Sequence, residues 1–83
     1  MATQEDFKTA AERAKGLPTQ SNDVLLELYS LYKQATDGDV SGEKPGMFDF
    51  VGKAKYEAWE LRQGMSKDDA MQAYIDLVGK LGG

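Results

Sequence analysis

Cysteine and histidine are both missing from this sequence of 83 residues. Without cysteine the chain has no disulfide to brace its fold, and it cannot build a thiolate metal site. Without histidine it has neither an imidazole metal site nor the base that Ser-His-Asp and Cys-His catalytic sets require. The sequence therefore excludes the commonest zinc sites and the commonest nucleophilic hydrolases.

Long apolar runs and an excess of positive charge are missing too. No stretch approaches the ~18 consecutive apolar residues of a membrane-spanning helix, and the polar start lacks the apolar segment of a signal peptide. The 14 acidic residues outnumber the 10 basic ones, which gives a net charge of −4. That balance argues against a nucleic-acid binder, whose affinity depends on a basic surface. We therefore expect a soluble cytoplasmic protein with one domain over residues 1–83, without nucleic-acid binding or stable membrane insertion.

Apolar residues recur at spacings of three and four, and strict alternation is absent, which predicts helices rather than strands. The pattern predicts one helix that ends before Gly16 and Pro18, one from Ser21 or Asn22 to near Thr36, one from near Asp49 to Gly64, and one from Ser66. Serine and asparagine are favoured N-caps, and the “SKDD” at residues 66–69 adds acidic residues in the first helical turn.

Between the second and third predicted helices lies a loop, residues 37–47, “DGDVSGEKPGM”, with three glycines and one proline. The fold expected is an all-α four-helix bundle with a long connection in its middle. Such a connection lets its two flanking helices run parallel or cross, so the pattern alone leaves the topology open. We expect Met47, Phe48 and Phe50 to anchor the loop to the core; the alternative is that they line a ligand groove.

Tyrosines and lysines gather around this loop. Tyr29, Tyr32 and Lys33 lie at i, i+3 and i+4 of the second predicted helix, so they occupy neighbouring turns of one face. Lys53 and Lys55 follow the loop at the start of the third. Because tyrosine rings stack on nucleotide bases and lysines pair with phosphates, these side chains suit a site for a phosphorylated nucleotide. The spacing alone favours the alternative, which is ordinary packing of half-buried tyrosines beside solvated lysines.

Three blocks of the sequence resemble one protein family. “YKQATDGD” at residues 32–39, “PGMFDFVGKAKYEAW” at 45–59 and “SKDDAMQAYIDLV” at 66–78 have the order and nearly the spacing seen in the acyl-CoA-binding protein family. The resemblance extends from Phe7 to about Val78, and the first two blocks are specific to that family. Tyr56 departs from the pattern, because most members have tryptophan there, and Val51 stands where lysine is common.

The resemblance implies an up-down-down-up bundle with the long connection between helices two and three. It also implies non-covalent binding and intracellular transport or buffering of medium- to long-chain fatty acyl-CoA thioesters, without catalysis and without a cofactor. The ligand residues that it implies are Lys15, Tyr29, Tyr32, Lys33, Lys55 and Tyr74. Tyr32 would be the main adenine platform, with Lys33 and Lys55 as phosphate partners. The hydroxyl groups of Tyr29 and Tyr74 would meet the 3′-phosphate and the ribose, and Lys15 would approach the CoA head group.

Two other functions stay open at this point. One is a helical protein-interaction module whose groove binds a partner helix, and the other is an enzyme such as a thioesterase. For the enzyme, the chain offers no obvious activated nucleophile, since its hydroxyl groups have no histidine beside them. A monomer is expected, with enzymes that use acyl-CoA as its partners. The preferred acyl chain length is left open, because the departures at Val51 and Tyr56 would reshape the groove.

Overall fold

Four helices account for most of residues 3–82, the part of the chain that the computed structural model describes. They are α1 (Gln4–Ala14), α2 (Asn22–Asp37), α3 (Phe50–Glu60) and α4 (Lys67–Lys80). Residues 3–82 contain no strand, so the all-α expectation is confirmed. No helix in this part of the chain is both long and apolar enough to cross a bilayer.

Each helix begins after an N-cap residue, as the sequence predicts for the second and fourth helices. The caps are Thr3, Ser21, Asp49 and Ser66. In every case the cap side chain accepts a hydrogen bond from the backbone N–H three residues on, over 3.0–3.3 Å. Each cap thus satisfies one of the donors that the first turn leaves without a helical partner. Thr3 goes further, because the Asp6 carboxylate also accepts from its backbone N–H and completes a capping box.

The third helix is shorter than the sequence predicts, since it ends at Glu60 and not at Gly64. Beyond Glu60 the chain turns more tightly, and the N–H of Arg62 donates to the carbonyl of Trp59 over 2.9 Å. Gly64 then takes a positive φ of 93°, a conformation that glycine adopts without strain. Its N–H donates to the Asp39 carboxylate at 2.8 Å, a contact between distant segments that a local pattern does not reveal.

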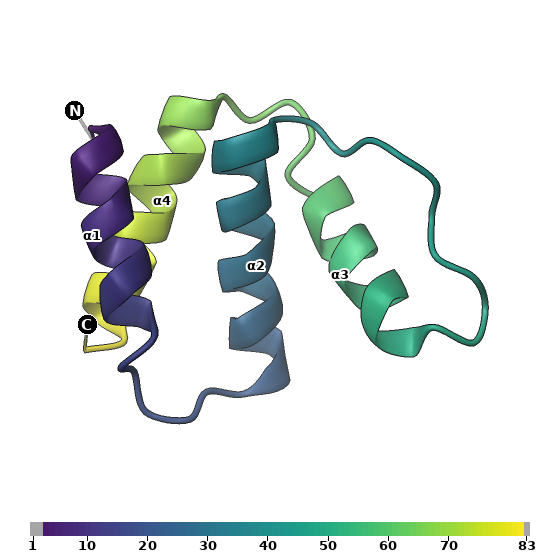
Figure 1. The fold of residues 1–83 in the computed structure, drawn as a ribbon, viewed down its shortest axis with the longest axis horizontal. Coiled ribbons are helices and arrows are strands. Elements are labelled where there is room, and N and C mark those ends of the chain that lie inside the picture. Colours follow the sequence, from purple (N-terminus) through teal and green to yellow (C-terminus); the bar gives the residue numbers. More distant parts are fainter. Residues whose placement is uncertain (1–2, 83) are drawn as a thin grey trace.

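The helices form an up-down-down-up arrangement around α2 (Figure 1). α4 and α3 pack against α2 on opposite sides, and α1 packs against α4. α2 and α3 run in the same direction, so the connection between them must travel the length of the bundle, as the long loop predicts. The described chain is a thin slab with extents of 36 × 28 × 15 Å.

One hydrophobic core fills the space between α1, α2 and α4. Its buried members are Phe7, Ala10, Leu31, Ala35, Ala70, Met71, Tyr74 and Val78. α3 adds no residue to this cluster. Its one buried residue, Trp59, packs separately and donates its Nε1–H to the carbonyl of Gly38 over 2.8 Å. α3 is therefore attached to the bundle by α2 and by the start of the long connection.

Hydrogen bonds of Asp39 and Gln34 attach the start of the long connection and the turn after α3 to α2. Gln34 is fully buried and donates its side-chain amide to Asp39 at 2.9 Å and to the carbonyl of Met65 at 2.8 Å. Asp39 also accepts from Gly64, and this backbone hydrogen bond, followed by that from Gln34, lowers the pKa of its carboxyl group. The carboxylate thus joins α2, the start of the long connection and the turn before α4.

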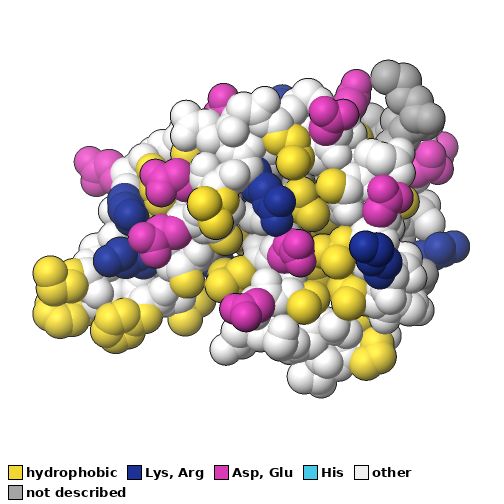
Figure 2. Space-filling model, turned by 180° about the vertical axis from the view of Figure 1, so that it is seen from behind, with side chains coloured by type: hydrophobic (Ala, Val, Ile, Leu, Met, Phe, Trp, Pro, Cys, Tyr) yellow, Lys and Arg dark blue, Asp and Glu magenta, His cyan; other side chains and the backbone are white. Residues whose placement is uncertain are grey.

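The expectation that Met47, Phe48 and Phe50 anchor the connection to the core is wrong. Their exposed fractions are 74, 86 and 74%. Figure 2 shows hydrophobic side chains gathered at the end of the molecule that α3 and the connection form. Polar contacts hold the connection instead: the Tyr56 hydroxyl donates to the carbonyl of Gly42 at 3.2 Å, and Lys44 pairs with Glu57 at 3.1 Å.

Candidate functional site

Three aromatic rings from three helices meet at one end of the core. Phe7 of α1, Tyr32 of α2 and Tyr74 of α4 have ring centroids 5.2–5.9 Å apart. Two of the three pairs are edge-to-face and one is tilted, geometries that aromatic rings favour. Tyr74 is buried, and burial raises the pKa of its hydroxyl, whereas Tyr32 is 41% exposed. The cluster therefore offers a fixed aromatic surface that remains open to a ligand.

Two hollows meet at this cluster and form one groove, the tyrosine groove. The larger has a volume of about 720 Å³ and lies along α1, with Phe7, Tyr32 and Tyr74 in its wall. The smaller has a volume of about 310 Å³ and has Tyr29 in its wall. Four residues line both hollows: Ala11, Lys15, Tyr32 and Tyr74. A phosphorylated aromatic ligand would find ring faces and ammonium groups here within one depression.

A third hollow, the apolar hollow, lies between α2 and α3 and has a volume of about 300 Å³. Its lining residues are Asn22, Leu25, Leu26, Phe50, Val51, Ala54 and Lys55. Leu25 also lines the smaller part of the tyrosine groove, so the two depressions adjoin along α2. An apolar surface next to an aromatic and basic one suits a ligand with a polar head and an apolar tail.

Two lysines stand beside the tyrosines of the groove. Lys15 lines both parts of it and forms an exposed ion pair with Glu12 at 3.5 Å. Lys55 of α3 places its Nζ 5.2 Å from the centre of the Tyr29 ring, within the range of a cation–π contact. Lys55 also lines the apolar hollow, so it stands where the two depressions adjoin.

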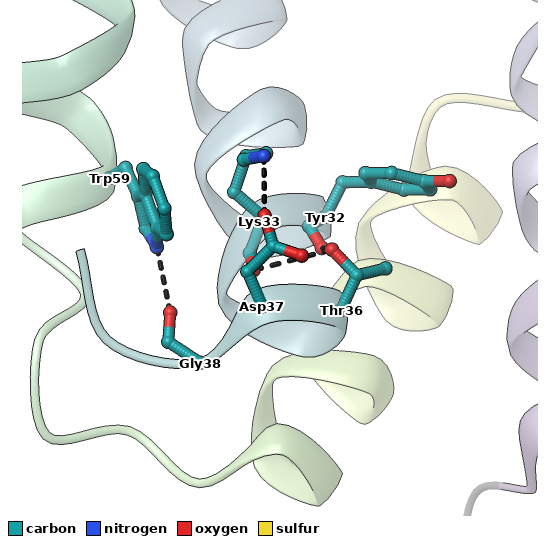
Figure 3. Close-up of polar contacts among 6 residues, drawn as sticks. All are labelled: Tyr32, Lys33, Thr36, Asp37, Gly38 and Trp59. Atoms are coloured by element: carbon teal, nitrogen blue, oxygen red, sulfur yellow. Dashed lines mark hydrogen bonds and ion pairs between the residues drawn. The ribbon is translucent and has the colours of Figure 1, made fainter. Parts of the chain in front are cut away.

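Lys33, unlike Lys15 and Lys55, has Asp37 and Trp59 as its partners. Its Nζ lies 2.5 Å from the Asp37 carboxylate and 4.9 Å from the centre of the Trp59 ring. Figure 3 shows this pair between Trp59 on one side and Tyr32 on the other. The hydrogen bond to Asp37 raises the pKa of Lys33 and lowers that of Asp37. Lys33 is not among the residues that line these three hollows within the described part of the chain.

The structure thus brings together most of the residues expected from the sequence. One hollow is lined by Lys15, Tyr29, Tyr32 and Tyr74, which come from the C-cap of α1, from α2 and from α4. Lys55 makes a cation–π contact with Tyr29 of this set. Lys33 is instead paired with Asp37. Tyr32 and Lys33 are consecutive on α2, and they make contacts with different neighbouring helices. Whether all six residues bind a ligand stays a prediction.

Sequence reasoning missed the part of the groove that α1 supplies. Lys8 lines the larger hollow together with Lys15. Seven residues, or close to two helical turns, separate these lysines, so they share a face of α1. That spacing was readable from the sequence, and it would have placed a second ammonium group on the groove.

The described residues offer binding groups and no metal centre. No group of three or more acidic side chains within residues 3–82 is arranged to hold a metal ion. The groove instead supplies ring faces, ammonium groups and hydroxyl groups.

Known proteins are similar to this chain over most of its length. The family described as “Acyl CoA binding protein” matches residues 4–78. The chain is 54% identical over 76 residues to “Acyl-CoA-binding protein homolog 1” of Caenorhabditis elegans, covering 90% of this chain and 88% of that protein. It is 49% identical over 81 residues to “Enoyl-CoA delta isomerase 2” of Rattus norvegicus, where the match covers 96% of this chain and 21% of that protein.

A solved structure also matches the fold closely. The crystal structure of Oryza sativa Acyl-CoA-Binding Protein 2 superposes with a TM-score of 0.92 at 48% identity, covering 94% of this chain and 88% of that one. The arrangement of the four helices is therefore one that relatives at this level of identity share.

Proposed function

Because this chain belongs to the acyl-CoA-binding protein family, we propose that it binds medium- to long-chain fatty acyl-CoA thioesters without converting them. It would carry or buffer these thioesters in the cytoplasm and pass them to enzymes that use acyl-CoA. The observation that carries the proposal is the tyrosine groove beside the apolar hollow, because an acyl-CoA has an aromatic, phosphorylated head and an apolar tail.

The tyrosine groove suits the head group. Tyr32 has an exposed ring supported by Phe7 and Tyr74, so it can stack on adenine, a contact worth roughly 1–3 kcal/mol. Lys55 and Lys33 would pair with phosphates, and Lys15 would approach the head group from α1. The hydroxyl groups of Tyr29 and Tyr74 would donate to the 3′-phosphate and the ribose.

The apolar hollow suits the acyl chain. Leu25, Phe50 and Val51 in its wall are among the most exposed large apolar side chains of the described residues. An alkyl chain that covers them removes apolar surface from water on both partners, which contributes about 0.8 kcal/mol per buried methylene. The proposed function thus accounts for exposed apolar residues that the core does not use.

A helical partner is the alternative occupant of these depressions. An amphipathic helix would use the exposed apolar residues, but it would have no use for lysines beside clustered tyrosine rings. We therefore place the partner-helix function second. One domain over residues 1–83 and a monomeric state complete the proposal, since the exposed groove is assigned to a ligand rather than to a second copy.

Titration calorimetry with palmitoyl-CoA tests the function directly. We expect saturable binding of one ligand per chain with a dissociation constant in the micromolar range or below, since head and tail both contribute to affinity. An amphipathic helical peptide at the same concentration serves as the comparison and should give no heat of binding. Heat from the peptide and none from palmitoyl-CoA would favour the partner-helix function and reject the one proposed.

Replacing Lys55 should show whether the phosphates lie at the junction of the two depressions. We expect Lys55→Ala to weaken palmitoyl-CoA binding by about 1–3 kcal/mol, the worth of a hydrogen bond to a charged group. Lys53→Ala is the matched control, because it removes the same charge from the same helix two residues away. Equal losses of affinity in the two variants would mean that only the total positive charge of α3 matters and that Lys55 makes no direct contact with the phosphates.

A further inference from the structure

The ion pair between Lys33 and Asp37 is well formed but poorly suited to stabilise its helix. Asp37 is the last residue of α2, where the negative end of the helix dipole disfavours an acidic side chain. The pair also has lysine N-terminal to the acid at i, i+4, which is the less favourable order. The last turn of α2 holds no basic residue to compensate. Helix stability therefore does not explain an aspartate at this position.

Lys33 directly follows Tyr32 on α2, yet Asp37 holds its ammonium group away from the residues that line the tyrosine groove. Tyr29 lies one helical turn before Lys33 on the same helix. Both of these tyrosines line the groove. The carboxylate of Asp37 holds the ammonium over the Trp59 ring, on the side of α3 (Figure 3). The side chain is flexible and 27% exposed, so a rotation about its own bonds can redirect it.

We propose that Asp37 is a positioning residue that competes with the ligand for Lys33. In the free protein its carboxylate occupies the place of a phosphate on the ammonium group. When a phosphorylated ligand enters the tyrosine groove, Lys33 exchanges this carboxylate for a phosphate oxygen. Asp37 thereby lowers the affinity of the site for the ligand, which makes release of the ligand easier. This inference rests on the proposed binding of acyl-CoA.

A second lysine, Lys67, keeps a positive charge near the Asp37 carboxylate after Lys33 has moved to the ligand. The side chain of Lys67, at the start of α4, passes beside Gly38, which follows Asp37. Its positive charge also contributes to the lowered pKa of Asp37. After Lys33 leaves, the carboxylate keeps a cation nearby and a half-exposed position in water, with 48% of its side chain exposed. The exchange therefore leaves no buried charge without a partner.

Asp37→Asn tests the competition by removing the charge with little change in shape. We expect this variant to bind palmitoyl-CoA about two- to fivefold more tightly at low ionic strength, the range that a half-exposed ion pair accounts for. Glu27→Gln is the matched control, because Glu27 also lies on α2 and pairs with Arg62 at 3.8 Å, away from the groove. Its affinity should equal that of the parent.

The gain must depend on Lys33, which a general loss of negative charge would not require. In the Lys33→Ala background, Asp37→Asn should therefore bring no increase in affinity. Asp37→Ser should behave as Asp37→Asn does, and thermal unfolding should show that the variants are folded. An equal gain in Glu27→Gln, a gain that persists without Lys33, or no gain at all would overturn the competition. Failure of the parent itself to bind palmitoyl-CoA would overturn the proposed function, and this inference with it.

Discussion

Free CoA should bind this protein at least about a thousandfold more weakly than palmitoyl-CoA. At about 0.8 kcal/mol per buried methylene, a fully covered palmitoyl chain contributes roughly 10 kcal/mol. Ordering the ligand and the side chains around it removes much of this gain. If the acyl chain still contributes a net binding free energy of about 4 kcal/mol, the difference in affinity is about three orders of magnitude. Calorimetry with CoA and its octanoyl, lauroyl and palmitoyl esters measures both the total and the increment per methylene.

Ligands with only a head group or only a tail also distinguish the contribution of the tyrosine groove from that of the apolar hollow. Free palmitate carries the tail without the head group, so it should bind hardly at all if the tyrosine groove determines the identity of the ligand. The affinity should rise with chain length until the apolar hollow is filled, and then level off. Dissociation constants for CoA and palmitoyl-CoA within tenfold of each other would show that the apolar hollow does not receive the chain.

Trp59→Ala should cause the largest loss of stability among the single substitutions considered. Truncation of a buried tryptophan costs about 3–5 kcal/mol of unfolding free energy. Trp59 is 7% exposed, and its Nε1–H holds the carbonyl of Gly38. α3 has no other buried residue and packs against α2 alone among the four helices. Chemical denaturation followed by circular dichroism measures the loss, and hydrogen exchange should show α3 opening before the other helices.

Two nearby variants make this prediction specific. Trp59→Phe keeps most of the apolar ring but loses the hydrogen bond, so we expect a loss of about 1–2 kcal/mol. Leu61 lies two residues on and is 85% exposed, so Leu61→Ala should change the stability by less than about 0.5 kcal/mol. A loss in Trp59→Ala as small as that in Leu61→Ala would mean that the contact with Trp59 does not attach α3 to α2.

The helices and their starts could be predicted because local chemistry decides them. Apolar spacing and the caps Ser21, Asp49 and Ser66 are features of a few consecutive residues. The end of α3 could not be predicted in the same way. Gly64 is held by Asp39, a residue 25 positions earlier, so a contact between segments helps to set where the chain turns.

The candidate site was only partly readable for the same reason. The tyrosines of α2 follow helical spacing, and the resemblance to a family supplied Lys15 and Tyr74 on other helices. Helical spacing alone puts Lys33 beside Tyr29 and Tyr32, and Asp37 at i+4 could have been noticed as a rival partner. The exposed residues after the loop were misjudged, because apolar composition predicts burial and does not say whether a core or a ligand provides it.

The shared core between α1, α2 and α4 has a consequence for biosynthesis. Half of its eight buried residues lie on α4, the last of these four helices to be translated, and they are Ala70, Met71, Tyr74 and Val78. A nascent chain that has delivered only the first three helices to the ribosome surface lacks these partners for Phe7 and Leu31. The core between α1, α2 and α4 can therefore close only after α4 emerges, so we expect the bundle to fold as one unit.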